Sequence, residues 1–262
     1  MPGDKYLAQP KDIVYIYDGS WSGFFCCVYE SVYSREIPFA IYTQENAQPS
    51  LWPEKPIATD EKTAARVRES IPKKISPRSF ELVENVYFSC MKSKEIHMLR
   101  FLIKAFSLGP KTVNMLGDPD VAPMLKAERH LLGERHLLLG FIRFSDSGGA
   151  LTASITPKNF ILPYIADHFI DRYANEDFMI YDKTHKAALI YQNKQKQIVR
   201  IEDVEFPAVS RNEEYYRSLW KQFYNTVAIK ARTNPKCRMT HMPKRYWENM
   251  IEMEDELPAG PG

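Results

Sequence analysis

The stretch FMIYDKTHKAALIYQNKQKQIVRIED, residues 178–203, holds three short runs in which apolar and polar residues alternate. The runs FMIYD, KAALIYQ and QIVRIED are rich in β-branched and aromatic residues, which favours strands. Only a few polar residues separate each run from the next, so neighbouring runs pair in opposite directions. The stretch therefore predicts an antiparallel meander, the sheet around which the rest of the fold is arranged.

Helical patterns with recognisable starts dominate the chain before the meander. One run begins at Thr59 or Asp60, a second at Ser76 with Pro77 behind it, and a third at Asp118. The runs GFIRFSD (140–146) and ALTASITP (150–157) predict a hairpin, because the glycine pair between them supplies turn dihedrals. Together these patterns predict an α+β fold, an antiparallel sheet with packed helices.

The last strong helical pattern, NEEYYRSLWKQFYNTVAIKAR, covers residues 212–232. Ser210 with Glu213 three residues later fits a capping box. The apolar residues recur at helical spacing, so one face is expected to be buried. That face comprises Leu219, Trp220, Phe223, Val227 and Ile229.

The bulk composition is that of a folded globular protein. The 262 residues are 44% hydrophobic and 26% charged, with a net charge of +2. We expect one globular domain over residues 1–250, with possible halves 1–139 and 140–250, followed by an acidic tail, 251–262. No apolar run approaches the roughly 18 residues of a membrane span. The N-terminus lacks a signal peptide and the four cysteines are scattered, which predicts a cytoplasmic protein without a metal site.

The N-terminal motif YDGSWSGFFCCVYE, residues 17–30, predicts a strand end, an Asp-Gly turn and a helix. Cys26 and Cys27 inside it are open to two readings. A reactive thiol pair needs exposure and a lowered pKa. Flanking phenylalanines favour the other reading, in which both are buried core thiols.

Residues 230–250 carry six basic residues against one acidic residue. Basic side chains neutralise phosphates, and aromatic side chains between them offer stacking faces for unpaired bases. The alternative is a basic loop whose aromatic rings dock onto the core. The predicted DNA contacts are Arg232, Lys236, Arg238, Lys244 and Arg245 for phosphates and Tyr246 and Trp247 for stacking.

The common catalytic templates are missing from the sequence, which has no glycine-rich phosphate loop, nucleophile elbow or zinc-deaminase motif. An enzymatic pocket could still be assembled at the ends of predicted strands and helices. Its weak candidates are Asp18, Ser20, His136, Arg143 and His168. Whether the chain is an enzyme stays open, and the residues predict no cofactor.

Several segments, taken in order, resemble a bacterial domain-of-unknown-function family labelled probable DNA metabolism proteins. They extend from about residue 13 to residue 250. The segments are YDGSWSGFFCCVYE, PIATDEKTAARV, DPDV, LLGFIRF, PYIADHFIDRY, MIYDKTHKAALIY, LWKQFYNTVAIKARTNP and MPKRYWENM.

The resemblance implies a role in DNA repair or modification. It also implies an association with a radical S-adenosylmethionine protein and a relation to domains that are fused to a uracil-DNA glycosylase domain. We expect an accessory protein that binds DNA and acts with the radical S-adenosylmethionine partner. We do not expect it to bind a membrane. The alternatives are an enzyme acting on a nucleobase or nucleotide, and a protein–protein adaptor without DNA affinity.

Overall fold

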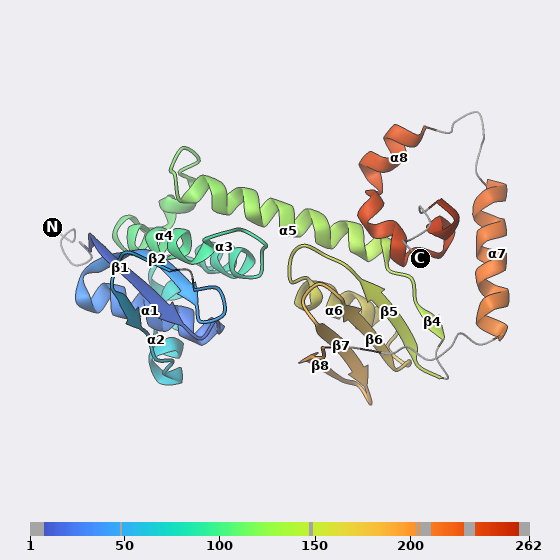
Figure 1. Cartoon of the computed structure of the whole chain (residues 1–262), viewed down its shortest axis with the longest axis horizontal. Coiled ribbons are helices and arrows are strands. Elements are labelled where there is room, and N and C mark those ends of the chain that lie inside the picture. The colour runs from blue at the N-terminus through green and yellow to red at the C-terminus, as the bar shows by residue number, and fades with distance from the viewer. Residues whose placement is uncertain are drawn as a thin grey trace. The chain divides into compact units, whose positions relative to one another are not determined.

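The computed structural model of the chain describes residues 8–47, 49–146, 149–202, 204, 211–227 and 234–256 (Figure 1). The chain folds into two compact units, Met1–Leu131 and Leu132–Gly262. The boundary falls inside helix α5 (Val121–Phe141). Within the described ranges, no helix combines the length and the apolar character needed to cross a membrane.

The sheet of the first unit is parallel. Its strands β1 (Gln9–Tyr17), β2 (Glu36–Thr43) and β3 (Glu54–Pro56) lie in the order β2-β1-β3. Parallel neighbours need a long crossover, and α1 (Trp21–Ser34) provides it between β1 and β2. The predicted sequence of strand, turn and helix is confirmed here, whereas an antiparallel sheet would be wrong for this unit.

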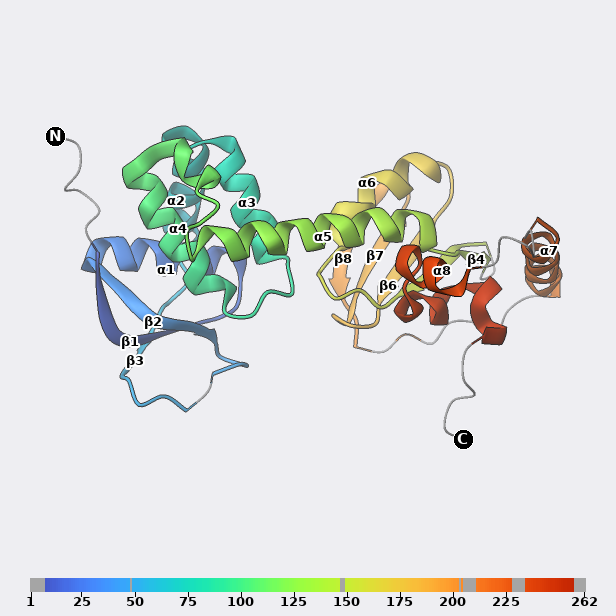
Figure 2. The ribbon, with the colours of Figure 1, turned by 90° about the horizontal axis from the view of Figure 1, so that it is seen from above.

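The helices of this unit lie on one side of its sheet (Figure 2). After α1 these are α2 (Glu61–Lys74), α3 (Pro77–Tyr87) and α4 (Lys94–Leu108), and a short 3₁₀ helix, η1 (Gly109–Asn114), follows. Of these, α1 and α4 contact the strands, and the others pack against helices. Cys26 and Cys27 lie in the core between them. Burial raises the pKa of the Cys27 thiol, so this thiol stays protonated at neutral pH. The core reading of the cysteine pair is confirmed.

The second unit contains the predicted meander. Strands β6 (Phe178–Asp182), β7 (Ala187–Gln192) and β8 (Gln195–Arg200) pair in antiparallel order. Two more strands, β4 (Ser145–Asp146) and β5 (Leu151–Ile155), complete the order β4-β5-β6-β7-β8. β5 and β6 are parallel, because α6 (Leu162–Arg172) returns the chain between them. The α+β fold class is confirmed.

The described C-terminal segments of the second unit are helical. They are α7 (Arg211–Val227), α8 (Pro235–His241), η3 (Lys244–Asn249) and η4 (Ile251–Glu256). η4 lies in the segment expected as an acidic tail, and there Glu252 and Met253 are buried. This part of the segment therefore packs against the unit.

Two sequence expectations are wrong in detail. The predicted hairpin forms as the antiparallel pair of β4 with β5, but the run 140–146 contributes only the two-residue strand β4, because the leucine-rich helix α5 continues through Phe141. The predicted buried face of α7 is also wrong at Leu219 and Trp220, which are 41% and 40% exposed. The remaining residues of that face, Phe223, Val227 and Ile229, lie outside the described side chains, as does the predicted cap Ser210.

Candidate functional site

The five residues considered for an enzymatic pocket do not form one site within either unit. Asp18 and Ser20 belong to the first unit, whereas His136, Arg143 and His168 belong to the second. Arg143 lines a pocket of the second unit. His136 and His168 are exposed and do not belong to its lining. The residues of the first unit and those of the second are therefore described separately.

Asp18 and Ser20 form the cap of helix α1. The Asp18 carboxylate accepts hydrogen bonds from Ser20 Oγ at 2.7 Å and from Thr59 Oγ1 at 2.8 Å. Ser20 Oγ in turn accepts the N–H of Gly23 at 2.9 Å. Burial opposes ionisation of Asp18, but the hydrogen bonds from Ser20 and Thr59 outweigh it, and the pKa of Asp18 lies below its ordinary value. These contacts account for both side chains by helix capping.

Tyr246 and Trp247 are buried, so the expectation that their rings are open stacking faces is wrong. Tyr246 Oη donates to Glu134 Oε1 at 3.0 Å, and Arg245 Nη2 lies 2.8 Å from the same oxygen. Trp247 Nε1 donates to the carbonyl of Met242 at 2.9 Å. The alternative reading, in which the rings dock onto the core, is confirmed.

The basic residues of the same segment have different surroundings. Lys236 and Lys244 are exposed. The Arg238 guanidinium lies 5.0 Å from the centre of the Trp247 ring, which is cation–π distance. Arg232 lies outside the described residues. Phosphate contact by these side chains stays a prediction, and without the two rings the segment loses the stacking half of the pattern.

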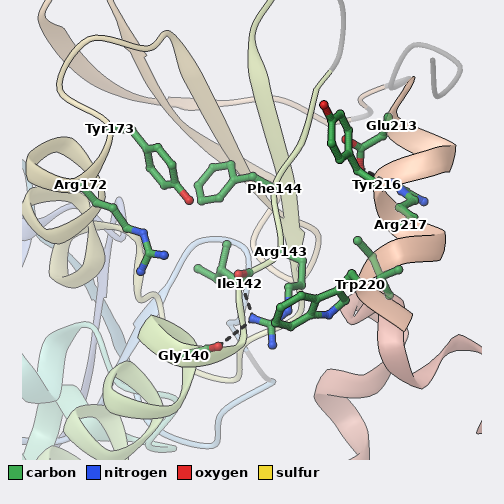
Figure 3. Close-up of a pocket in the computed structure, with 11 residues that line it drawn as sticks. Gly140, Ile142, Arg143, Phe144, Arg172, Tyr173, Glu213, Tyr216, Arg217 and Trp220 are labelled. Carbon is green, nitrogen blue, oxygen red and sulfur yellow. Dashed lines mark hydrogen bonds and ion pairs between the residues drawn. The ribbon is translucent and has the colours of Figure 1, made fainter. Parts of the chain in front are cut away.

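The second unit has a pocket of about 540 Å³ between the C-terminal ends of α5 and α6 and the side of α7. Figure 3 shows Arg172 and Tyr173 on one side, Tyr216, Arg217 and Trp220 on the other, and Phe144 between them. The lining contains three arginines and four aromatic residues, and we call it the Arg–aromatic pocket. Its lining residues are Gly140, Ile142, Arg143, Phe144, Arg172, Tyr173, Glu213, Tyr216, Arg217, Trp220 and Ile251.

Arg143 is held in place from several directions. Its Nη2 lies 2.7 Å from Glu252 Oε1, and its Nη1 donates to the Gly140 carbonyl at 2.8 Å. Trp220 Nε1 donates to the second Glu252 oxygen at 3.1 Å, and the Arg143 guanidinium lies 5.8 Å from the Trp220 ring centre. Burial alone would raise the pKa of Glu252, but the Arg143 contact outweighs it and the pKa lies below its ordinary value. Glu252 is therefore an anion that fixes Arg143 and Trp220.

The other two arginines of the pocket differ in their electrostatic partners. Arg217 Nε lies 3.1 Å from Glu213 Oε1, one turn earlier on α7, and Arg217 Nη2 donates to Ser145 Oγ at 2.6 Å. Arg172 is exposed, and no ion pair joins it to a carboxylate of the described residues. The guanidinium of Arg172 lies 5.7 Å from the Tyr173 ring centre.

The aromatic residues give the pocket accessible ring surface. Tyr216 is 65% exposed and Trp220 is 40% exposed, and both belong to α7 at a spacing of four residues, which places them on one helix face. Phe144 packs edge-on against Tyr173 with ring centres 5.0 Å apart. Large exposed aromatic rings beside guanidinium groups are able to bind a planar, anionic ligand.

Sequence reasoning missed most of this pocket. The signal was present in FIDRY and EYYRSLW, where arginine and aromatic residues alternate as they do in residues 230–250. Apolar periodicity shows that Trp220 lies on the apolar face of its helix. It does not show whether another element covers that face, so the exposure of Trp220 was not predicted. Among the residues that the structure describes, no group of three His, Cys, Asp or Glu side chains is placed to hold a metal ion.

Comparison with known proteins identifies the family. A domain of unknown function, DUF4130, matches residues 92–252, which is more than half of the chain, and the chain belongs to this family. No curated protein and no solved structure matches the chain.

Proposed function

We propose that this member of the DUF4130 family binds single-stranded or locally unpaired DNA in the Arg–aromatic pocket. The chain is then an accessory protein of DNA repair or modification, and a radical S-adenosylmethionine partner carries out the chemistry. The proposal assigns binding, and no reaction, to the chain itself.

One observation carries the proposal: the exposed Arg172 guanidinium, the two carboxylate-paired arginines and four aromatic rings line a single pocket. Proteins that bind unpaired strands combine cationic groups for the backbone with aromatic faces for the bases. Trp220 and Tyr216 offer such faces, and Arg172 offers a cation on the opposite side (Figure 3). Both kinds of contact thus support binding at one place.

The same geometry favours unpaired over duplex DNA. In a duplex the faces of the bases are covered by their neighbours, so an aromatic side chain reaches them only after a base is unstacked. Trp220 is fixed by the Glu252 hydrogen bond to its indole N–H, and its ring remains 40% exposed. A ring held in this way stacks with little loss of side-chain freedom.

Binding of a fluorescein-labelled oligothymidylate, followed by anisotropy, tests the proposal with a matched pair of variants. Tyr216 and its neighbour Tyr215 are 65% and 61% exposed on α7, but only Tyr216 belongs to the pocket lining. We expect Tyr216→Ala to weaken binding by roughly 1–3 kcal/mol, the value of one stacked base, and Tyr215→Ala to leave binding nearly unchanged. Equal effects of the two variants, or no binding by the unaltered chain, would contradict the proposal.

A further inference from the structure

We infer that the Arg–aromatic pocket takes one nucleotide unit through a single phosphate, with Arg172 as the phosphate contact and Tyr216 and Trp220 as the stacking surface. This inference rests on the proposed function and specifies its ligand. It excludes a track along several phosphates of a strand at this site.

The charges of the pocket set the number of phosphates. Arg143 is neutralised by Glu252 at 2.7 Å, and Arg217 is neutralised by Glu213 at 3.1 Å. Arg172 has no such carboxylate among the described residues. Of the three arginines, Arg172 is therefore the one whose charge is best able to attract an anion.

The neutralising carboxylates also oppose a second phosphate. The Glu252 side chain is 2% exposed, so its charge is little screened by water. A phosphate brought to Arg143 would meet this negative charge at close range or would have to displace it. Removing a buried carboxylate from its partner is costly, because the charge that stays behind loses its ion pair. Arg143 and Glu252 thus position Trp220 and do not serve as a phosphate site.

The size and layout of the pocket fit one nucleotide. A volume of about 540 Å³ lies within the range of roughly 300–1,000 Å³ typical of small-molecule sites. Figure 3 shows Arg172 across the pocket from Tyr216 and Trp220. A nucleotide has its phosphate at one end and its base at the other, so it is able to contact both sides at once.

The inference predicts how binding responds to salt. Each phosphate that a protein neutralises on a single strand gives a slope of about −0.7 in a plot of log K against log salt concentration. If one phosphate of oligothymidylate contacts Arg172, its binding to this pocket should have a slope of about −0.7. A track of several phosphates would give a multiple of this value.

Titration calorimetry of the full chain with dTMP, thymidine and inorganic phosphate provides the test. We expect dTMP to bind about 10- to 100-fold more tightly than thymidine, the range of a charge-assisted hydrogen bond, and inorganic phosphate to bind weakly. Arg172→Ala should reduce dTMP affinity to that of thymidine and leave thymidine affinity unchanged. Arg172→Lys should keep the salt slope of oligothymidylate binding, because it keeps the charge. Arg200→Ala, an exposed arginine of β8 outside the pocket, is the matched control and should change nothing.

The outcomes separate this inference from the proposed function. Oligothymidylate that binds with Tyr216 dependence but with a slope of several units, and without sensitivity to Arg172→Ala, would overturn the single-phosphate inference and leave DNA binding intact. Binding of dTMP through Arg172 without binding of the oligonucleotide would support the inference and contradict the proposed function. Equal affinity for dTMP and thymidine would also overturn the inference.

Discussion

Glu36 is a buried carboxylate that three donors of the first unit surround. Lys11 Nζ lies 2.6 Å from one carboxylate oxygen, and Lys55 Nζ and Tyr15 Oη each lie 2.7 Å from the other. Burial alone would raise the pKa of Glu36, but these hydrogen bonds outweigh it and lower the pKa to about 2. Because this carboxyl is almost fully buried, its ionisation is linked to the stability of the unit.

The pH dependence of stability is the prediction at Glu36. Its folded-state pKa lies below the unfolded value, so the carboxylate stabilises the fold above about pH 5, and this stabilisation is lost as the pH falls toward 2. Glu36→Gln should cost roughly 2–3 kcal/mol of unfolding free energy at pH 7 and progressively less below pH 4, as measured by urea denaturation. Glu54→Gln, an exposed glutamate of the same sheet, is the control and should have little effect. A cost for Glu36→Gln that does not change with pH would refute the linkage.

Buried carboxylates limit what the sequence could predict about the candidate site. A glutamate is normally exposed, so the burial of Glu134 and Glu252 has no local signal. Their partners Arg245 and Arg143 lie more than one hundred positions away in the chain. Local charge identified residues 230–250 as basic, but only the folded unit reveals that Arg245 forms an ion pair with the buried Glu134.

Helix starts are the elements that local residues determine most directly here. The side chains of Asp60 and Ser76 accept backbone N–H groups at the starts of α2 and α3, as the sequence predicted. A helix cap involves only a few neighbouring residues, so the local sequence is enough to predict it. The exposure of one face of α7 and the parallel pairing of β5 with β6 depend on segments that are distant in the chain. Local sequence patterns therefore do not predict them.

A pair of glycine substitutions tests the start of α1. A Cβ on Gly23 would lie 2.2 Å from Asp18 Oδ1 and 2.9 Å from Thr59 Oγ1, whereas a Cβ on Gly133 in α5 would meet nothing within 4 Å. Gly23→Ala should destabilise the protein by about 1–3 kcal/mol through crowding of the cap. Gly133→Ala should stabilise it by about 0.5–1 kcal/mol, because alanine favours the helix. Thermal denaturation of both variants measures the difference, and a neutral Gly23→Ala would contradict the crowded geometry.

At the scale of the whole molecule, the low net charge and the division into two units favour binding at one local site over binding through an overall electric field. The net charge is only +2, too small to attract nucleic acid through a general field. Two units each have a sheet of their own, and the Arg–aromatic pocket belongs entirely to the second. A small, single site of this kind is expected to bind DNA modestly by itself, so a partner that supplies further contacts would raise the affinity of the assembly.

Co-purification tests the proposed partnership. We expect the chain to co-purify with the radical S-adenosylmethionine protein, and the complex to bind oligothymidylate at least about tenfold more tightly than either protein alone, because linked sites act together. Tyr216→Ala should reduce binding by the complex while co-purification persists. Co-purification without any DNA affinity in either state would instead identify a protein–protein adaptor, and failure to co-purify would refute the partnership.

The contact between η4 and the Arg–aromatic pocket has a practical consequence for gene design. The family match ends at residue 252, which invites a shortened gene with its stop codon there. Glu252 would then carry the free terminal carboxylate, and Met253, fully buried beside it, would be missing. The Glu252 side chain, which orients the indole N–H of Trp220, would then stand at the chain end without the rest of η4 to hold it. Shortened genes intended for binding studies should therefore retain η4 to Glu256.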